Sequence, residues 1–409
     1  MTRILKNSNL AGFQIPSIYV HVPFCSSKCF YCDFNSYVSN GQVIRAYFEA
    51  LSREITLASK IYDVSKTGKI QTIYFGGGTP SLVYPQYIEG VLDQIRASFV
   101  CEDELEITLE CNPESIDKDR AEAYKKMGIN RLSIGLQTYD DDLLKIIGRI
   151  HTKTDFDRAY NLLVAKGFSN INVDLMTGLP YQNFKDLEKS LEHVITLGPQ
   201  HISTYSLSIN EGTPFFDNFD YYSKYLPDDG IERDMYHYIS DRLQGLGMLH
   251  YEVSNFARPG FESKHNTMCW QGYNYYGFGA GASSYIGDER RHNEDKVDRY
   301  ISLVHEAEEF LGLYNEIVEK LSAKDRQNEF FLLGFRLLKG VNLEDFSRQF
   351  CQSERNLELE GEPNCPEREE YRYILDEMVK EGLLSKEENN YHLNRHGLDF
   401  ANLVFEKFI

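Results

Sequence analysis

Short runs rich in β-forming residues alternate with helical patterns through the first half of the chain. The predicted strands are Ser17–Val22, Gln71–Phe75, Leu105–Cys111, Arg131–Gly135, Asn170–Leu175 and His201–Ser206. The predicted helices between them are Tyr47–Ala58, Tyr87–Ala97, Lys118–Lys126, Thr154–Ala165 and Phe184–Thr196. Strands that alternate with helices indicate right-handed βαβ units, and therefore an α/β fold built on a parallel sheet.

Six such units predict a partial (β/α)6 barrel, an open relative of the eight-stranded barrel. In barrels of this kind, residues at or just after the carboxyl ends of the strands line the active site. Several unusual residues occupy such positions: Cys25, the loop Gly76–Pro80, Glu110, Gln137 and Asp174. We therefore expect these residues to meet at one mouth of the barrel.

The alternation stops after about residue 215. The Tyr- and Asp-rich stretch 216–229 is typical of an excursion or lid, and it is followed by a predicted helix, Ile231–Leu246. The last ninety or so residues predict a small, mostly helical, winged-helix-like domain, with helices Asp325–Leu338, Leu343–Phe350, Glu367–Glu381 and Arg395–Phe408 and a charged turn at Ser385–Asn390. The expected division is an N-terminal segment 1–16, the barrel 17–250, a connection 251–319 and a C-terminal domain 320–409.

Length and charge narrow the classes of function. A chain of 409 residues is long enough for two domains, and 43 Lys and Arg against 62 Asp and Glu leave a net charge of −19. Such an acidic surface repels phosphate backbones, so we expect no nucleic-acid partner. The C-terminal domain is expected to pack against the rest of the chain or to bind a partner protein, because it contains acidic runs at Glu354–Glu362 and Glu367–Glu370. The sequence predicts no integral membrane segment and no signal peptide, and hence a cytoplasmic protein.

Three of the eight cysteines, Cys25, Cys29 and Cys32, lie within eight residues, directly after the first predicted strand. A disulfide scaffold is not expected in reduced cytosol. Three thiolates at C-x3-C-x2-C spacing can bind three irons of a 4Fe-4S cluster and leave the fourth iron open to a substrate. The alternative is a zinc site with Asp33 or His21 as fourth ligand, although structural zinc usually takes two C-x2-C pairs.

The spacing of these cysteines resembles that of the radical S-adenosylmethionine (SAM) superfamily. The glycine run of the Gly76–Pro80 loop follows the second strand, and it resembles the superfamily loop that binds the methionyl ammonium of SAM. The resemblance implies a 4Fe-4S cluster on the three cysteines, SAM on its open iron, and a low-potential electron donor such as a flavodoxin or ferredoxin. It also implies SAM contacts from Tyr19, Gly77, Gly78, Thr79, Glu110, Gln137, Arg149 and Asp174.

Residues 15–400 further resemble the oxygen-independent coproporphyrinogen III oxidase group, through YVHVPFC, FGGGTPS, LECNPES, GRIHT and DLMTGLPYQ. That group holds oxidases, which decarboxylate porphyrinogen propionates, and heme chaperones, which pass heme to acceptor proteins. Oxidases carry a further cysteine where this chain has Phe34, and a longer segment before the cluster. We therefore expect a heme chaperone, with the oxidase as the alternative and a structural zinc protein as a third possibility.

The segment His265–Trp270 resembles the H-N-x-x-Y-W motif that is associated with heme binding in the chaperones. Here Cys269 stands where tyrosine is usual. Imidazole and thiolate both bind heme iron, so His265, the expected heme contact, and Cys269 are each competent ligands. The tract Tyr273–Tyr285 is expected either to offer a flat apolar surface to a porphyrin or to pack at the barrel edge.

Overall fold

The computed structural model describes residues 14–61, 68–307, 314–351 and 365–409. The acidic run at 354–362 and most of the N-terminal segment lie outside these residues. The described chain divides into two compact units. The first takes the residues before His250 together with Phe256–His265 and Tyr273–Lys320, and the second takes His250–Asn255, Asn266–Gly272 and Leu321–Ile409.

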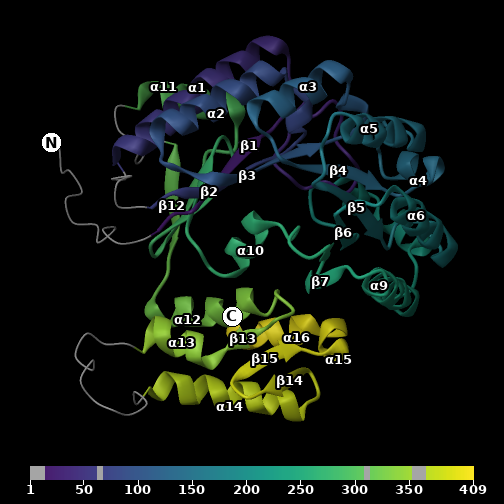
Figure 1. The fold of residues 1–409 in the computed structure, drawn as a ribbon, viewed down its shortest axis with the longest axis vertical. Coiled ribbons are helices and arrows are strands. Elements are labelled where there is room, and N and C mark those ends of the chain that lie inside the picture. The colour runs from purple at the N-terminus through teal and green to yellow at the C-terminus, as the bar shows by residue number, and fades with distance from the viewer. Residues whose placement is uncertain (1–13, 62–67, 308–313, 352–364) are drawn as a thin grey trace. The chain divides into compact units, whose positions relative to one another are not determined.

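The predicted strands form the parallel centre of one sheet, in chain order. They are β1 (Ser17–Val22), β2 (Ile70–Gly77), β3 (Cys101–Cys111), β4 (Arg131–Gln137), β5 (Ile171–Thr177) and β6 (His201–Ser206). Each pairs in parallel with the next. The outer face carries α1 (Gly41–Ile61), α2 (Pro85–Ser98), α3 (Lys118–Met127), α4 (Asp141–Ile146), α5 (Lys153–Ala165) and α6 (Phe184–Leu197) (Figure 1). The α/β barrel prediction is therefore confirmed.

Alternation along the strands separates an apolar outer face from a polar inner one. On β4, Leu132, Ile134 and Leu136 are fully buried in the main hydrophobic core. Ser133 and Gly135, on the other face of the same strand, line a cavity. Since successive side chains of a strand point to opposite faces, this alternation directs polar groups toward the inside of the barrel.

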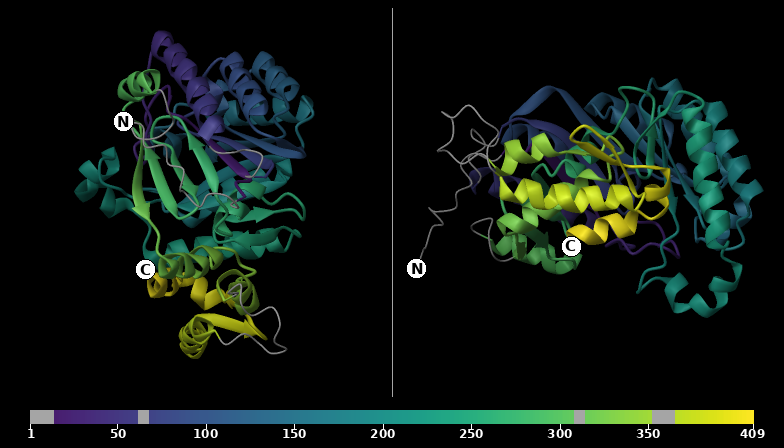
Figure 2. Two further views of the ribbon diagram at one scale, coloured as in Figure 1. Left: turned by 90° about the vertical axis from the view of Figure 1, so that its left-hand side faces the viewer. Right: turned by 90° about the horizontal axis from the view of Figure 1, so that it is seen from below.

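The sheet continues beyond the six predicted strands. On the side of β1 follow β9 (Tyr275–Phe278), β10 (Ser283–Ile286), β11 (Glu289–Asn293) and β12 (Asn315–Lys320), which lie side by side in Figure 2. At the other edge lie β8 (Asn255–Ala257) and β7 (Leu249–Glu252). The sheet thus extends beyond the six predicted strands on both sides, and the tract Tyr273–Tyr285 forms β9 and β10, two of its inner strands.

A buried carboxyl group ties the added strands to α1. Glu54 of α1 accepts hydrogen bonds from the Tyr300 hydroxyl (2.5 Å), Asn293 Nδ2 (2.7 Å) and the Gly279 backbone N–H (2.8 Å). Tyr300 belongs to α11 (Val297–Glu306). Burial raises the pKa of Glu54 to about 7. Three hydrogen bonds to one buried carboxyl group therefore hold α1 against the segments that carry the added strands.

After β6 the chain makes the predicted excursion. It contains the short helices α7 (Pro214–Asp217), α8 (Phe219–Tyr222) and η3 (Ser223–Tyr225), and it leads into α9 (Asp229–Gln244). Helix α10 (Lys264–Trp270) carries the H-N motif. No helix in the described part of the chain is long and apolar enough to span a membrane.

The second unit packs helices against a small antiparallel sheet. Its helices are α12 (Ala323–Gly334), α13 (Leu343–Phe350), α14 (Pro366–Lys380), α15 (Arg395–Asp399) and α16 (Ala401–Phe405), and its strands are β13 (Val341–Asn342), β14 (Leu384–Glu387) and β15 (Asn390–Leu393). The predicted charged turn Ser385–Asn390 is the β14–β15 hairpin, and the predicted last helix is broken at Phe400. Aromatic rings, among them Phe331, Phe346 and Phe408, dominate its core.

Cys351 and Cys365 form a disulfide in this unit, with their Cα atoms 5.7 Å apart. The sequence predicted no disulfide scaffold, and it gave no sign of this single cross-link. The end of α13 and the start of α14 bring the two residues within disulfide distance, and their separation of 14 residues along the chain does not reveal this.

Candidate functional site

A cavity of about 390 Å³ lies at the carboxyl ends of the parallel strands, within the first unit. Its walls include Cys25, Cys29, Cys32, Gly77, Gly78, Thr79, Glu110, Gln137, Arg149 and Asp174. The structure thus brings together every predicted site residue except Tyr19 and His265. Parallel strands place their carboxyl ends at one edge, which explains why residues far apart in the sequence meet here.

The cysteine loop between β1 and α1 is fixed from both sides. Inside the loop, the Cys25 N–H donates to the Tyr37 carbonyl oxygen (3.0 Å). From outside, the Phe30 N–H donates to the Ile147 carbonyl oxygen (3.0 Å). The Phe30 ring lies against Gly148, where an added Cβ would come within 2.9 Å of it. The loop is therefore held against the chain segment that carries Arg149.

Two of the three cysteine sulfurs of this loop accept hydrogen bonds from the opposite wall. Thr79 Oγ1 donates to Cys25 Sγ (3.5 Å), and Arg149 Nη1 donates to Cys29 Sγ (3.7 Å). Asn112 connects these donors: its Nδ2 donates to Thr79 Oγ1 (3.0 Å), and its Oδ1 accepts from Arg149 Nη2 (2.8 Å). Asn112 was missed from the sequence, although it follows β3 directly and so stands at a strand end.

The glycine loop after β2 has no room for side chains. A Cβ at Gly78 would lie 2.8 Å from the Phe24 carbonyl oxygen and 3.0 Å from Cys25 Sγ. Gly77 adopts φ +108°, and a Cβ there would lie 2.5 Å from the His21 ring. Glycine at both positions lets the backbone approach the cysteine loop directly.

Two carboxyl groups are buried in the cavity wall. Glu110 accepts hydrogen bonds from the Tyr74 hydroxyl (2.8 Å) and the Gly77 N–H (3.2 Å), and burial raises its pKa to about 7. Asp174 accepts from Asn172 Nδ2 (2.8 Å), and burial raises its pKa as well. Buried carboxylates attract cations, so this wall suits a ligand that carries an ammonium or sulfonium group.

Gln137 ends β4 in a left-handed conformation, with φ +70°. The pairing of β4 with β5 shifts register between Gly135 and Gln137. At Gly135 an added Cβ would lie 2.7 Å from Gln137 Nε2 and 2.9 Å from Arg149 Nη2. Unfavourable backbone angles of this kind cluster at functional sites, where the surrounding structure holds them.

Tyr19 and His265 lie near Tyr74 and do not line the cavity. The Tyr19 hydroxyl is 3.0 Å from His21 Nδ1, and its ring stacks with that of Tyr74. His265 is 6% exposed, its Nδ1 is 2.9 Å from Thr72 Oγ1, and its ring centroid is 5.1 Å from that of Tyr74. Burial lowers the pKa of His265 to about 3, so its imidazole is neutral.

The thiols fit a 4Fe-4S cluster. They share one cavity wall, and two sulfurs face donors that stabilise thiolates. Burial raises the pKa of the unliganded Cys25 and Cys32 thiols, and bound iron would hold them as thiolates. Among the described residues, no three His, Cys, Asp or Glu side chains are grouped to hold a single metal ion.

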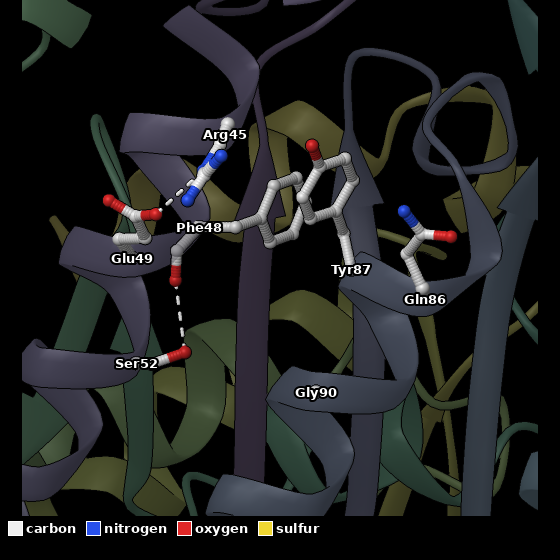
Figure 3. A pocket seen from close by; sticks show the side chains of 7 residues that line it. All are labelled: Arg45, Phe48, Glu49, Ser52, Gln86, Tyr87 and Gly90. Atoms are coloured by element: carbon white, nitrogen blue, oxygen red, sulfur yellow. Dashed lines mark hydrogen bonds and ion pairs between the residues drawn. The ribbon is translucent and has the colours of Figure 1, made fainter. Parts of the chain in front are cut away.

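A larger hollow, of about 590 Å³, lies between α1 and α2 on the outside of the barrel (Figure 3). Its floor is the stacked pair Phe48 and Tyr87, with ring centroids 4.9 Å apart, and Arg45 forms an ion pair with Glu49 beside it. Neither a cysteine nor a strand-end residue lines this hollow. The groups that can bind a cluster are therefore in the smaller cavity.

Comparison with known proteins agrees with this geometry. Residues 19–194 match the family model of the Radical SAM superfamily, and residues 321–400 match that of the HemN C-terminal domain. The fold is similar to that of HemN, the coproporphyrinogen III oxidase of Escherichia coli, with a TM-score of 0.80 and 22% identity over 98% of this chain and 91% of that chain.

Curated relatives span nearly the whole chain. The heme chaperone HemW of Bacillus subtilis is 34% identical over 96% of this chain and 99% of its own length. That of Lactococcus lactis is 36% identical over 96% and 97%, and that of Escherichia coli is 31% identical over 96% and 98%. The chain belongs to the radical SAM superfamily and, within it, to the family of the HemW proteins.

Proposed function

We propose that this protein is a heme chaperone of the radical SAM type, which binds heme and delivers it to acceptor proteins. The observation that carries the proposal is identity of 31–36% with the HemW chaperones of three bacteria, over 96% of the chain in each case. Phe34 supports the same choice: it lines the cavity and is 61% exposed, at the position where the resemblance gives oxidases a further cysteine.

The proposed cofactors are a 4Fe-4S cluster on Cys25, Cys29 and Cys32, and SAM in the adjoining cavity. When bound and reduced, the cluster supplies a single electron at low potential. Arg149 and Thr79 donate to the ligand sulfurs and so balance the negative charge of the thiolates. The Glu110 and Asp174 carboxyl groups face the cavity, where they would balance the positive charges of SAM.

A flavodoxin or ferredoxin would supply the electron. Both donors are usually acidic, so either would dock on a local basic patch of this protein.

His265 remains the proposed heme contact within the H-N motif. Its imidazole is neutral, and Thr72 engages Nδ1, which leaves Nε2 as the nitrogen for a metal. The side chain is 6% exposed, so heme would reach it only after local opening. Cys269 is the weaker candidate because burial raises its thiol pKa to about 11, and the thiolate is the form that binds iron.

A paired assay tests this function against the oxidase alternative. Anaerobically reconstituted protein is mixed with SAM, dithionite and coproporphyrinogen III, and protoporphyrinogen and 5′-deoxyadenosine are measured. In parallel, heme-loaded protein is mixed with an apo-acceptor, and the transfer of heme is followed. Heme transfer without protoporphyrinogen is the expected result, and many turnovers of vinyl product would make the protein an oxidase.

The cluster is tested by iron and sulfide analysis of single Cys→Ala variants. Changes at Cys25, Cys29 or Cys32 are expected to abolish the brown chromophore after reconstitution. Cys101 and Cys111 lie outside the cysteine loop and serve as matched controls. A full cluster in the triple variant would overturn the assignment, and zinc in place of iron would favour the structural zinc protein.

A further inference from the structure

Five aromatic rings face solvent where the excursion after β6 meets the loop after β5. Four belong to the excursion and one, Tyr181, to the loop. Their side chains are between 38% and 53% exposed: Tyr181, Phe216, Phe219, Tyr221 and Tyr225. Both segments follow the carboxyl ends of strands, as do the walls of the cluster cavity. Exposed aromatic side chains that gather in so short a stretch of chain are a feature of binding sites.

The exposed rings are not a core that failed to pack, because the excursion has its own buried apolar side. Phe215 is fully buried, and it packs with Leu144, Met176 and Leu179 in a separate small core. Its N–H donates to the Phe30 carbonyl oxygen of the cysteine loop (3.0 Å). The inward face of the excursion thus packs against the first unit, whereas the rings on its outward face remain exposed to solvent.

Three of the exposed rings form a tyrosine cluster: Tyr181, Tyr221 and Tyr225. The Tyr181 and Tyr221 hydroxyl oxygens are 3.1 Å apart. The Tyr181 ring stacks on that of Tyr225, with centroids 4.1 Å apart and planes inclined by 22°. The Tyr221 and Tyr225 ring centroids are 5.4 Å apart. Two phenol oxygens therefore share one hydrogen bond on a surface made of aromatic rings.

The backbone holds this arrangement at an energetic cost. Tyr181 adopts φ +67°, a left-handed conformation that is unusual for a bulky residue. Its N–H donates to the Tyr225 carbonyl oxygen (2.7 Å), which fixes the loop to the excursion. Unfavourable backbone angles persist where surrounding contacts impose them. Here the hydrogen bond to Tyr225 holds the Tyr181 loop so that the Tyr181 and Tyr221 hydroxyl groups stay together at the surface.

We propose that the tyrosine cluster is a binding site for ferric heme, with the Tyr221 phenolate as axial ligand and the Tyr181 hydroxyl as hydrogen-bond donor to the ligating oxygen. The inference rests on the proposed function and adds a site outside the H-N motif. Tyrosinate is an established axial ligand of ferric heme. On binding, the Tyr221 oxygen replaces the axial water of the ferric iron: the iron–water bond breaks as the iron–phenolate bond forms, the phenol proton goes to solvent, and the iron stays ferric.

The assignment of the two roles follows from their surroundings. Tyr221 is 53% exposed, so iron can approach its oxygen from solvent. The hydrogen bond with Tyr221 raises the pKa of Tyr181, so Tyr181 keeps its proton and can donate it to a neighbouring phenolate. Phe216 and Phe219 are further exposed apolar side chains of the same excursion. His265, at 6% exposed, offers no such access without opening.

The test is titration of the full chain with ferric hemin, followed by absorption and resonance Raman spectroscopy. Tyr221→Phe keeps the ring and its packing but removes the ligand, and Tyr181→Phe removes only the donor. Tyr84→Phe is the matched control, because Tyr84 is 65% exposed and lies outside the cluster. Melting curves of all variants establish that they fold.

For the wild type we expect a phenolate-to-iron charge-transfer band and release of one proton for each heme bound. Tyr221→Phe should lose the band and bind ferric hemin at least about tenfold more weakly. Tyr181→Phe should keep the band but bind about fivefold more weakly, the usual effect of one hydrogen bond. Tyr84→Phe should match the wild type.

A band that survives in Tyr221→Phe would overturn the tyrosine site. So would a wild-type spectrum of imidazole type that is lost in His265→Ala, although that result would leave the proposed chaperone function intact. Absence of any heme binding by the wild type would overturn both the site and the function.

Discussion

Arg149 Nη2 donates a hydrogen bond of 2.8 Å to Asn112 Oδ1, deep in the wall of the cluster cavity. The amide nitrogen of Asn112 donates in turn to Thr79 Oγ1. Thr79 and Arg149 are the donors to Cys25 and Cys29, so a chain of hydrogen bonds runs from one cysteine sulfur to the other. Asn112 is thus a positioning residue for both donors.

Asn112→Ala is expected to lower the reduction potential of the reconstituted cluster. Hydrogen bonds to the sulfurs of an iron–sulfur cluster help to set its potential. The variant removes the amide that donates to Thr79 Oγ1 and one of the two acceptors of Arg149 Nη2, the other being the Gly135 carbonyl oxygen. Redox titration monitored by electron paramagnetic resonance measures the shift. Asn210→Ala is the control, because Asn210 lines the same cavity but bonds to Asp33. Equal potentials in the two variants would contradict the role of Asn112.

SAM binding is expected to strengthen as pH rises through 7. The pKa of Glu110 is raised to about 7, so its carboxyl gains negative charge across this range, and that charge favours a cationic ligand. Below pH 7 the affinity should fall by up to about tenfold for each pH unit. Equilibrium dialysis of SAM against reconstituted protein, performed anaerobically between pH 6 and 8.5, measures the profile.

Glu110→Gln should flatten this profile, because the amide does not titrate. Glu114→Gln is the matched control, since Glu114 is outside the cavity lining. A pH profile that is unchanged in Glu110→Gln would assign the titration to another group, with Asp174 as the first to examine.

Glu54 should make the first unit less stable at alkaline pH. Its pKa in the folded chain is about 7, above its ordinary value of 4.5. The folded chain therefore favours the protonated carboxyl group. The stability that this group contributes is fully present below pH 4.5 and is lost as pH rises through 7. Between pH 5 and 8, the free energy of unfolding of the wild type should fall by up to about 3 kcal/mol more than that of Glu54→Gln. Urea denaturation across this range tests the difference, and parallel curves would contradict it.

Reduction of the Cys351–Cys365 disulfide should destabilise the second unit. A cross-link that closes a loop of this length contributes about 3 kcal/mol through the unfolded chain. Trp270, the only tryptophan, belongs to this unit, and its ring lies 4.3 Å from the Arg336 guanidinium carbon, so its fluorescence reports unfolding there. We expect a lower urea midpoint with reductant.

The double variant Cys351→Ser with Cys365→Ser provides the control for that measurement. It should unfold at the lower midpoint with or without reductant, and it should assemble the same cluster as the wild type. Identical midpoints for the oxidised and reduced wild type would show that the cross-link does not stabilise the unit.

Local sequence patterns determined the parallel strands, their helices and most of the cluster cavity. A strand such as β1 is set by its own residues, and the cysteines lie next to it in the chain, so their place at its carboxyl end follows directly. Glu110 and Asp174 were found in the same way. Each assignment needed only the type of one element and the rule that the carboxyl ends of parallel strands meet.

Tertiary structure alone decided contacts between distant parts of the chain. Asn112 meets Arg149 across 37 residues, and β9 joins the edge of β1 from more than 250 residues away. His265 lies in the core beside Thr72, and Cys351 reaches Cys365, because packing brings their elements together. A sequence pattern reports which face of an element is apolar, whereas the partner of that face depends on how all the elements pack.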